Sequence, residues 1–155
     1  METQNYNCTF TVKNTPHEVF DAICRVSEWW SVNTEGSASH LDDVFTLRFG
    51  KTTVDFKITE MVPDKKITWL VTDCYLDWLN DKKEWKGTQL DFEITGTAEG
   101  TRMSMAHIGL VPGIECYNDC KKGWDFFAGD SLRKLITEHK GQPDMSKAER
   151  ETAAV

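Results

Sequence analysis

The most informative segment of this chain is ECYNDCKKGWDFFAGDSLRKLITEHKG, residues 115–141. At about 100° per residue, an α-helix gathers most of its apolar side chains on one face. Those within about 80° of Trp124 are Tyr117, Cys120, Phe127, Ala128, Ser131, Leu132 and Leu135. The pattern predicts one long amphipathic helix. The polar face carries charges of both signs, which disfavours an anionic membrane surface, and no sustained heptad indicates a coiled coil.

Upstream of this helix, the chain alternates between apolar and polar residues, which is typical of strands with one buried face. Six such segments occur, at residues 5–12, 44–50, 52–62, 66–76, 88–98 and 101–110. Short turns between most of them predict antiparallel hairpins. After the first strand, Thr15, Pro16 and Glu18 carry the start signal of a short helix. A second short helix or turn contains Trp29 and Trp30.

A sheet with one wet face must cover its other face, and the C-terminal helix is the only predicted element large enough. The sequence therefore predicts an α+β fold with six antiparallel strands. We expect residues 1–143 to form a single domain and residues 144–155 to form a polar C-terminal tail, frayed or disordered.

Composition excludes several classes of function. The net charge of -7 disfavours nucleic acid as a partner. No apolar run approaches the roughly 18 residues needed for membrane insertion, and the first residues do not resemble a signal peptide. The five cysteines are scattered and odd in number, which predicts reduced thiols and a cytoplasmic location.

Two segments resemble a known family, namely GLVPGIECYNDCKKGWDFFAGDSLRKLITEHKGQP (residues 109–143) and TPHEVFDAICRVSEWWS (residues 15–31). They are similar to the bacterial branch of proteins like the activator of the ninety-kilodalton heat-shock chaperone ATPase, within the START-like, or SRPBCC, birch-pollen-allergen-like superfamily. The resemblance spans about residues 5–143. It implies a helix-grip fold, in which a curved six-stranded sheet, two short helices and the long helix enclose an apolar cavity. It implies no shared catalytic residues, since this fold hosts many functions.

From this resemblance we expect a small apolar or amphipathic molecule to bind in the cavity. Asp73 shares a strand face with Trp69, and His107 shares one with Met105. Both polar side chains are therefore expected to point inward and to orient the ligand. The candidate ligand-binding residues are Trp30, Phe45, Phe56, Trp69, Asp73, Phe92, Met105, His107, Tyr117, Cys120, Trp124 and Phe127. Gly123 and Gly129 are expected to permit a bend or a close approach to the sheet.

Two alternatives stay open. The chain could be a protein-interaction module or homodimer, with exposed apolar residues such as Phe126, Trp78 or Trp85. It could instead be a cyclase or hydrolase that uses His107 as a general base. No phosphate loop, nucleophile elbow or zinc-protease motif occurs, so we predict no catalytic residue and no cofactor. Cys116, Cys120 and His107 make only a loose group of three, so no metal is predicted. The charged run at residues 81–84 is typical of a solvated loop.

Overall fold

The structure is a computed structural model that describes residues 5–144. The predicted tail at residues 144–155 therefore lies almost wholly outside the described residues. Seven antiparallel strands form one sheet in the order β1-β7-β6-β5-β4-β3-β2. The strands are β1 (Tyr6–Val12), β2 (Thr34–Gly36), β3 (Val44–Phe49), β4 (Thr52–Val62), β5 (Lys66–Tyr75), β6 (Gln89–Thr97) and β7 (Gly100–Ile108).

The predicted count of six strands is wrong, because β2 adds a short edge strand beside β3. Three residues are too few to show the alternation that marks a strand in sequence. Gly36 ends β2 with a φ of 99°, and a Cβ there would lie 2.4 Å from the carbonyl oxygen of Val44. Only glycine adopts this backbone conformation without a clash. In the sequence, Gly36 therefore indicates a loop and not the end of a strand.

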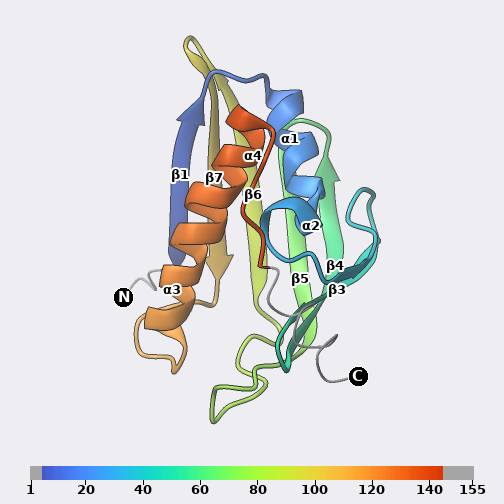
Figure 1. The fold of residues 1–155 in the computed structure, drawn as a ribbon, viewed down its shortest axis with the longest axis vertical. Helices are drawn as coiled ribbons and strands as arrows, with labels where there is room; N and C mark the ends of the chain where they lie inside the picture. Colours follow the sequence, from blue (N-terminus) through green and yellow to red (C-terminus); the bar gives the residue numbers. More distant parts are fainter. Residues whose placement is uncertain (1–4, 145–155) are drawn as a thin grey trace.

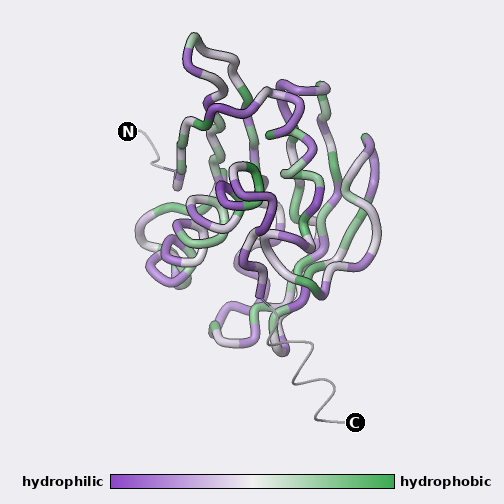
Figure 2. The backbone as a smooth tube through the Cα atoms, turned by 45° about the horizontal axis from the view of Figure 1, so that its top comes forward, coloured by the Kyte–Doolittle hydropathy of each residue, from purple (hydrophilic) through white to green (hydrophobic). Residues whose placement is uncertain are grey.

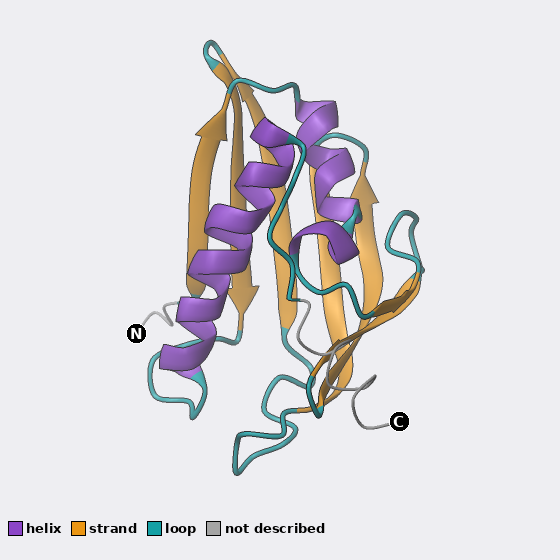
Figure 3. Cartoon of the chain, in the orientation of Figure 1, coloured by secondary structure: helices purple, strands orange, loops and turns teal. Residues whose placement is uncertain are grey.

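The helices cover one face of the sheet (Figures 1 and 3). Two short helices, α1 (Pro16–Cys24) and α2 (Val26–Trp29), follow β1. The expected capping box is present, since Thr15 Oγ1 accepts the Glu18 N–H and Glu18 Oε1 accepts the Thr15 N–H. The long C-terminal helix consists of α3 (Tyr117–Phe126), η1 (Phe127–Ser131) and α4 (Leu132–Glu138). The predicted long helix over an antiparallel sheet is thus confirmed.

The middle segment of the long helix, η1, is a π-helical turn. A π turn holds one more residue than an α turn, so the residues after it are rotated back by about 100°. Ile136 is consequently buried, although an unbroken α-helix would place it about 120° from Trp124. Ser131 Oγ, within the turn, donates to the Trp29 carbonyl and accepts the Gln142 N–H, both at 2.7 Å. These bonds fix the helix against α2.

Large aromatic side chains fill the space between the sheet and α2. Trp69 on β5 is fully buried at the centre of this cluster. Its ring lies 4.7 Å from Phe92, 5.0 Å from Phe45 and 5.4 Å from Phe56, measured between centroids. Figure 2 shows the alternation of hydrophobic and hydrophilic residues along the strands that produces this packed inner face. The aromatic cluster between the centre of the sheet and α2 is therefore a packed core.

Candidate functional site

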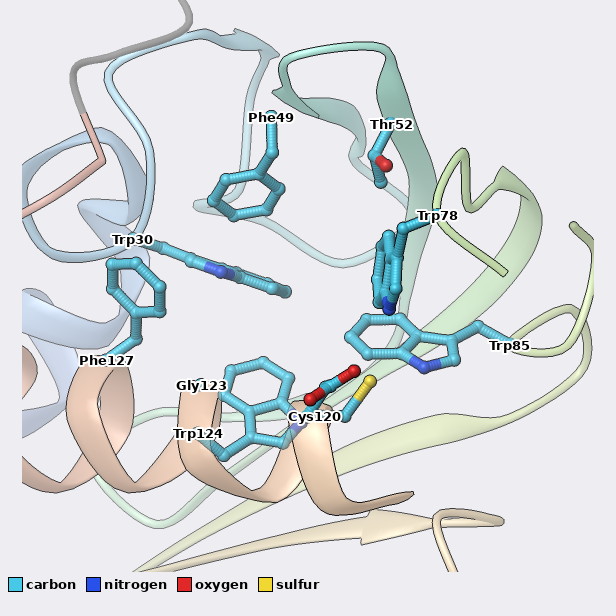
Figure 4. A pocket seen from close by; sticks show the side chains of 10 residues that line it. Trp30, Phe49, Thr52, Trp78, Trp85, Cys120, Gly123, Trp124 and Phe127 are labelled. Carbon is cyan, nitrogen blue, oxygen red and sulfur yellow. The ribbon is translucent and has the colours of Figure 1, made fainter. Parts of the chain in front are cut away.

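A pocket of about 260 Å³ lies beside the core, at the α3 end of the long helix (Figure 4). We call it the aromatic pocket, because six of its ten lining residues are Trp or Phe. Its lining is Trp30, Phe49, Thr52, Trp78, Trp85, Asp119, Cys120, Gly123, Trp124 and Phe127. The pocket thus combines apolar walls with a few polar groups, which is typical of small-molecule sites.

Four parts of the chain build these walls. Trp30 follows α2, Phe49 and Thr52 flank the β3–β4 turn, and α3 and η1 supply the helical side. The connection between β5 and β6, residues 76–88, supplies the two remaining tryptophans, and we call it the 76–88 loop. Trp30 lies 4.5 Å from Trp124, between ring centroids, and Trp85 stacks on Trp124 at 6.0 Å with 12° between planes. Figure 4 shows Trp78 and Trp85 facing Trp30 and Phe127 across the pocket.

Two glutamates fasten the 76–88 loop to the start of α3. The Glu115 carboxylate accepts the backbone N–H groups of Asn80 and Asp81 at 2.8 and 3.0 Å. In return, the Glu84 carboxylate accepts the backbone N–H groups of Glu115 and Cys116 at 3.0 and 2.9 Å. The bonds from Asn80 and Asp81 hold the pKa of Glu115 below its usual value. Glu84 therefore satisfies donors at a helix N-terminus, and the expectation that it is a solvated loop charge is wrong.

His107 is fully buried behind the pocket. The Trp124 indole N–H donates to His107 Nδ1 at 3.0 Å, and His107 Nε2 lies 2.9 Å from Thr88 Oγ1. Thr88 Oγ1 in turn donates to the Trp85 carbonyl at 2.7 Å. These bonds are all satisfied when His107 is neutral and carries its proton on Nε2. Burial lowers the pKa of His107 to about 3. Both ring nitrogens are engaged, so His107 holds the two wall tryptophans in place without lining the pocket.

Asp73 does not face the interior, and the expectation that it does is wrong. The pairing of β5 with β4 shifts register so that Thr72 is an extra residue on β5. A β-bulge of this kind reverses the inward and outward alternation beyond it. Cys74 is buried instead, and the Asp73 carboxylate, half exposed, pairs with Lys83 Nζ at 2.9 Å. The hydrogen bond from Lys83 is the main cause of the lowered pKa of Asp73.

The other predicted residues divide between pocket and core. Trp30, Cys120, Trp124 and Phe127 line the aromatic pocket. Tyr117 is half-buried outside the lining. The residues that fill the core beside the pocket are Phe45, Phe56, Trp69, Phe92 and Met105. Those that the sequence reasoning missed are Phe49, Thr52, Trp78, Trp85, Asp119 and Gly123. Phe49 alone had a usable signal, because it alternates with Phe45 along its strand.

The Cys120 thiol is the remaining potentially reactive group in the pocket lining. The pKa of the Cys120 thiol is raised by its hydrogen bond with Cys116 and by burial, so the thiol stays protonated at neutral pH. Within residues 5–144, no group of three or more His, Cys, Asp or Glu side chains is placed to hold a metal ion. No helix in the same range has the length and apolarity needed to cross a membrane.

Gly123 lies in the interior of α3, where glycine is unfavourable. A Cβ built on it meets no atom within 4 Å, and one on Gly129 meets only Cys8 Sγ at 3.5 Å. Gly123 therefore makes no close approach to the sheet, whereas Gly129, within the π turn, packs against Cys8 on β1. Replacing Gly123 by alanine is expected to raise the free energy of unfolding by about 1 kcal/mol, as measured by urea titration. Unchanged or lower stability would show that the methyl group is not tolerated at the pocket wall.

Comparisons with known proteins agree with this architecture. A protein-family model described as Activator of Hsp90 ATPase homolog 1-like protein matches residues 13–137. The solution structure of the Aha1 dimer from Colwellia psychrerythraea is 22% identical, with a TM-score of 0.68, and the match covers 86% of this chain and 96% of that chain. A crystal structure of a Mesorhizobium loti protein is 16% identical, with a TM-score of 0.68, covering 90% and 100%.

A third similar structure is that of DynU16, encoded in the dynemicin biosynthetic locus. It is 21% identical, with a TM-score of 0.65, and the match covers 88% of this chain but 48% of that chain. Likeness at these identities shows the fold alone. A search of curated proteins found no significant match.

Proposed function

Because this chain belongs to the family of Activator of Hsp90 ATPase homolog 1-like proteins, we propose that it binds a small apolar or amphipathic molecule in the aromatic pocket. The fold of this family is known for ligand binding and for co-chaperone roles. The observation that carries the proposal is the pocket itself, walled by six aromatic rings beside a solid core. Its volume of about 260 Å³ lies just below the range of about 300–1,000 Å³ typical of ligand pockets, which favours a small ligand.

The walls of the pocket are held before any ligand arrives. The Glu84 and Glu115 carboxylates fasten the 76–88 loop to α3, and His107 fixes the Trp124 ring. Side chains that are already ordered lose little further entropy when a ligand binds. The pocket therefore supports binding without rearrangement.

We propose no catalytic role for this pocket. A general base must reach a substrate proton, whereas both nitrogens of His107 are engaged inside the protein. The Cys120 thiol stays protonated, because its pKa is raised. Binding alone accounts for the arrangement of these side chains.

The neutral fluorescent probe N-phenyl-1-naphthylamine tests the proposal, with Gly123 as the point of control. Gly123→Phe places a ring at the pocket wall, whereas Gly123→Ala adds one methyl group at the same position. We expect the probe to bind the wild type and Gly123→Ala alike, and to bind Gly123→Phe at least about tenfold more weakly. Equal binding by all three folded proteins would place the probe elsewhere and contradict the proposal.

A second candidate function is association with a protein, either a partner or a second copy of this chain. Trp78 favours it, because 49% of this large apolar side chain is exposed at the pocket rim. The similar structure from Colwellia psychrerythraea is a dimer. The mass of the protein in solution, compared with that of Trp78→Ala, distinguishes a dimer built on this rim from a monomer.

We also propose that the protein works in the cytoplasm. All five cysteines are free thiols, and three of them are buried. Free thiols in this number are typical of a reducing compartment.

A further inference from the structure

We propose that the ligand of the aromatic pocket is an organic cation, with an alkylated ammonium group attached to an apolar body. This inference rests on the proposed binding function and specifies its chemical class. It follows from two features of the pocket that are independent of each other, namely the type of ring in its walls and the sign of the charge at its lining.

The first feature is the number of tryptophans. Four of the six aromatic lining residues are tryptophans, namely Trp30, Trp78, Trp85 and Trp124, and the other two are phenylalanines. Tryptophan faces attract cations more strongly than the faces of tyrosine or phenylalanine, and cages of aromatic rings recognise quaternary ammonium groups. The four tryptophans stand on both sides of the pocket (Figure 4). An alkylated ammonium group in the middle would therefore meet several ring faces at once.

The second feature is the charge at the pocket. Asp119 is the one carboxylate among the ten lining residues, and none of the ten is cationic. Its carboxylate forms no ion pair or hydrogen bond with any residue in the described range. The neighbouring Lys121 pairs with Asp125 at 3.2 Å, and Lys82 donates to the carbonyls of Asp77 and Leu79 at 2.6 Å. Asp119 is thus available to a ligand.

Other ligand classes fit these features less well. An anionic amphiphile such as a fatty acid would bring its carboxylate to Asp119, with no lining cation to balance either charge. A neutral apolar molecule would contact the aromatic walls but would not interact favourably with the Asp119 carboxylate. The chain also carries a net charge of -7, which raises the local concentration of cations and lowers that of anions. A cation with apolar substituents would contact the aromatic rings and would also pair its charge with the Asp119 carboxylate.

Three probes of similar size separate these classes: benzyltrimethylammonium, its uncharged carbon isostere neopentylbenzene, and the anion hydrocinnamate. Each displaces N-phenyl-1-naphthylamine from the pocket if it binds there. We expect the wild-type protein to bind the ammonium compound about tenfold more tightly than the isostere. The anion is expected to bind most weakly of the three.

Three variants, at Asp119 and Trp78, test whether the preference for the ammonium compound comes from the carboxylate or from the aromatic rings. Asp119→Asn keeps the size of the side chain and removes its charge, so affinity for the ammonium compound is expected to fall about fivefold, with the isostere unaffected. Trp78→Leu keeps an apolar wall but removes a ring, and Trp78→Tyr retains one. We expect the ammonium affinity to fall about tenfold in Trp78→Leu and clearly less in Trp78→Tyr.

The outcomes separate this inference from the function on which it rests. If the fluorescent probe binds and Gly123→Phe blocks it, but the ammonium compound binds no better than its isostere, the pocket is a neutral apolar site and the inference is overturned. The same follows if Asp119→Asn leaves the preference intact. If the fluorescent probe itself does not bind, the proposed function fails first.

Discussion

The free energy of unfolding is expected to fall by about 1.4 kcal/mol per pH unit as the pH drops from about 6 to 4. Burial lowers the pKa of His107 in the folded protein to about 3, from 6.5 for a free side chain. Above about pH 7.5 both states hold His107 neutral, so it adds no pH dependence there. Below that value only the unfolded chain takes up the proton, and stability is lost until the folded pKa is reached. The total loss is roughly 4–5 kcal/mol by pH 3.

His107→Gln is the matched variant for this measurement. Glutamine can accept from Trp124 and donate to Thr88, but it does not titrate. Urea titrations between pH 7 and pH 4.5 are expected to show the slope in the wild type and a flatter line in His107→Gln. The carboxyl groups whose pKa is lowered in the folded protein, Asp73 and Glu115 among them, also lose stability at the acid end of this window, because the unfolded chain protonates them first. They do so equally in the two proteins, so the difference between the two slopes reports His107. His17 has the opposite effect on stability, because its hydrogen bond with Asp64 raises its pKa. Its side chain is largely exposed, so solvent screens this contribution.

An equal slope in the two proteins would show that His107 is protonated in the folded state. The indole N–H of Trp124 would then have lost its acceptor, and the pocket wall would be differently arranged. The pH dependence is therefore also a test of the hydrogen bonds that hold the wall.

Replacing Trp29 by phenylalanine is expected to cost about 2–4 kcal/mol of stability, whereas the same change at Trp69 costs about 1–2 kcal/mol less. Both side chains are fully buried, so both variants lose the same volume. The Trp29 indole N–H donates to the Ile23 carbonyl at 3.2 Å, and its removal leaves that acceptor unpaired. The Trp69 indole nitrogen is buried with no hydrogen-bond partner in the described structure, so phenylalanine there removes a donor whose desolvation is uncompensated.

Urea titrations of Trp29→Phe and Trp69→Phe, compared at equal m-values, check this difference. If Trp69→Phe costs as much as Trp29→Phe, the Trp69 N–H has a partner after all. The Phe45 ring is a candidate, because it lies 5.0 Å from the Trp69 ring, between centroids, with 79° between the planes, which suits an N–H to π contact. That result would also mean that the Trp69 N–H, at the centre of the core, is not left without an interaction partner.

The interior of the fold shows where sequence reasoning reached its limit. Strand alternation alone predicts that Phe45, Phe56 and Phe92 point to the inner face, and all three are buried there. The same alternation failed at Asp73, because a bulge at Thr72 reverses it and nothing in the local pattern announces a bulge. On the long helix, the ideal wheel correctly predicts the buried Ala128, Leu132 and Leu135, but it does not include Ile136, which the π turn brings to the buried face.

The sequence predicts an apolar cavity beside the long helix, but it does not predict which residues line the aromatic pocket. Trp124 and Trp30, expected from the sequence to line a cavity, do line the pocket. Trp78 and Trp85 were expected only as exposed apolar residues of an interaction surface, but both line the pocket and Trp85 is buried. Their position depends on the Glu84 carboxylate, which binds backbone N–H groups about thirty residues further along the chain. A charged residue in a loop looks the same in sequence whether it is solvated or caps a distant helix.

Local patterns were enough to predict the antiparallel strands, the capping box and the amphipathic helix, because strand period, helix period and caps each act over a few residues. The family was indicated separately, by the resemblance of residues 15–31 and 109–143. The division of the aromatic residues between a solid core and an open pocket required the tertiary structure. Ring packing and hydrogen bonds join segments far apart in the chain, as they do for Trp124, His107 and Thr88. Whether a ring fills a space or lines one depends on all of its neighbours at once, and those neighbours meet only in the folded chain.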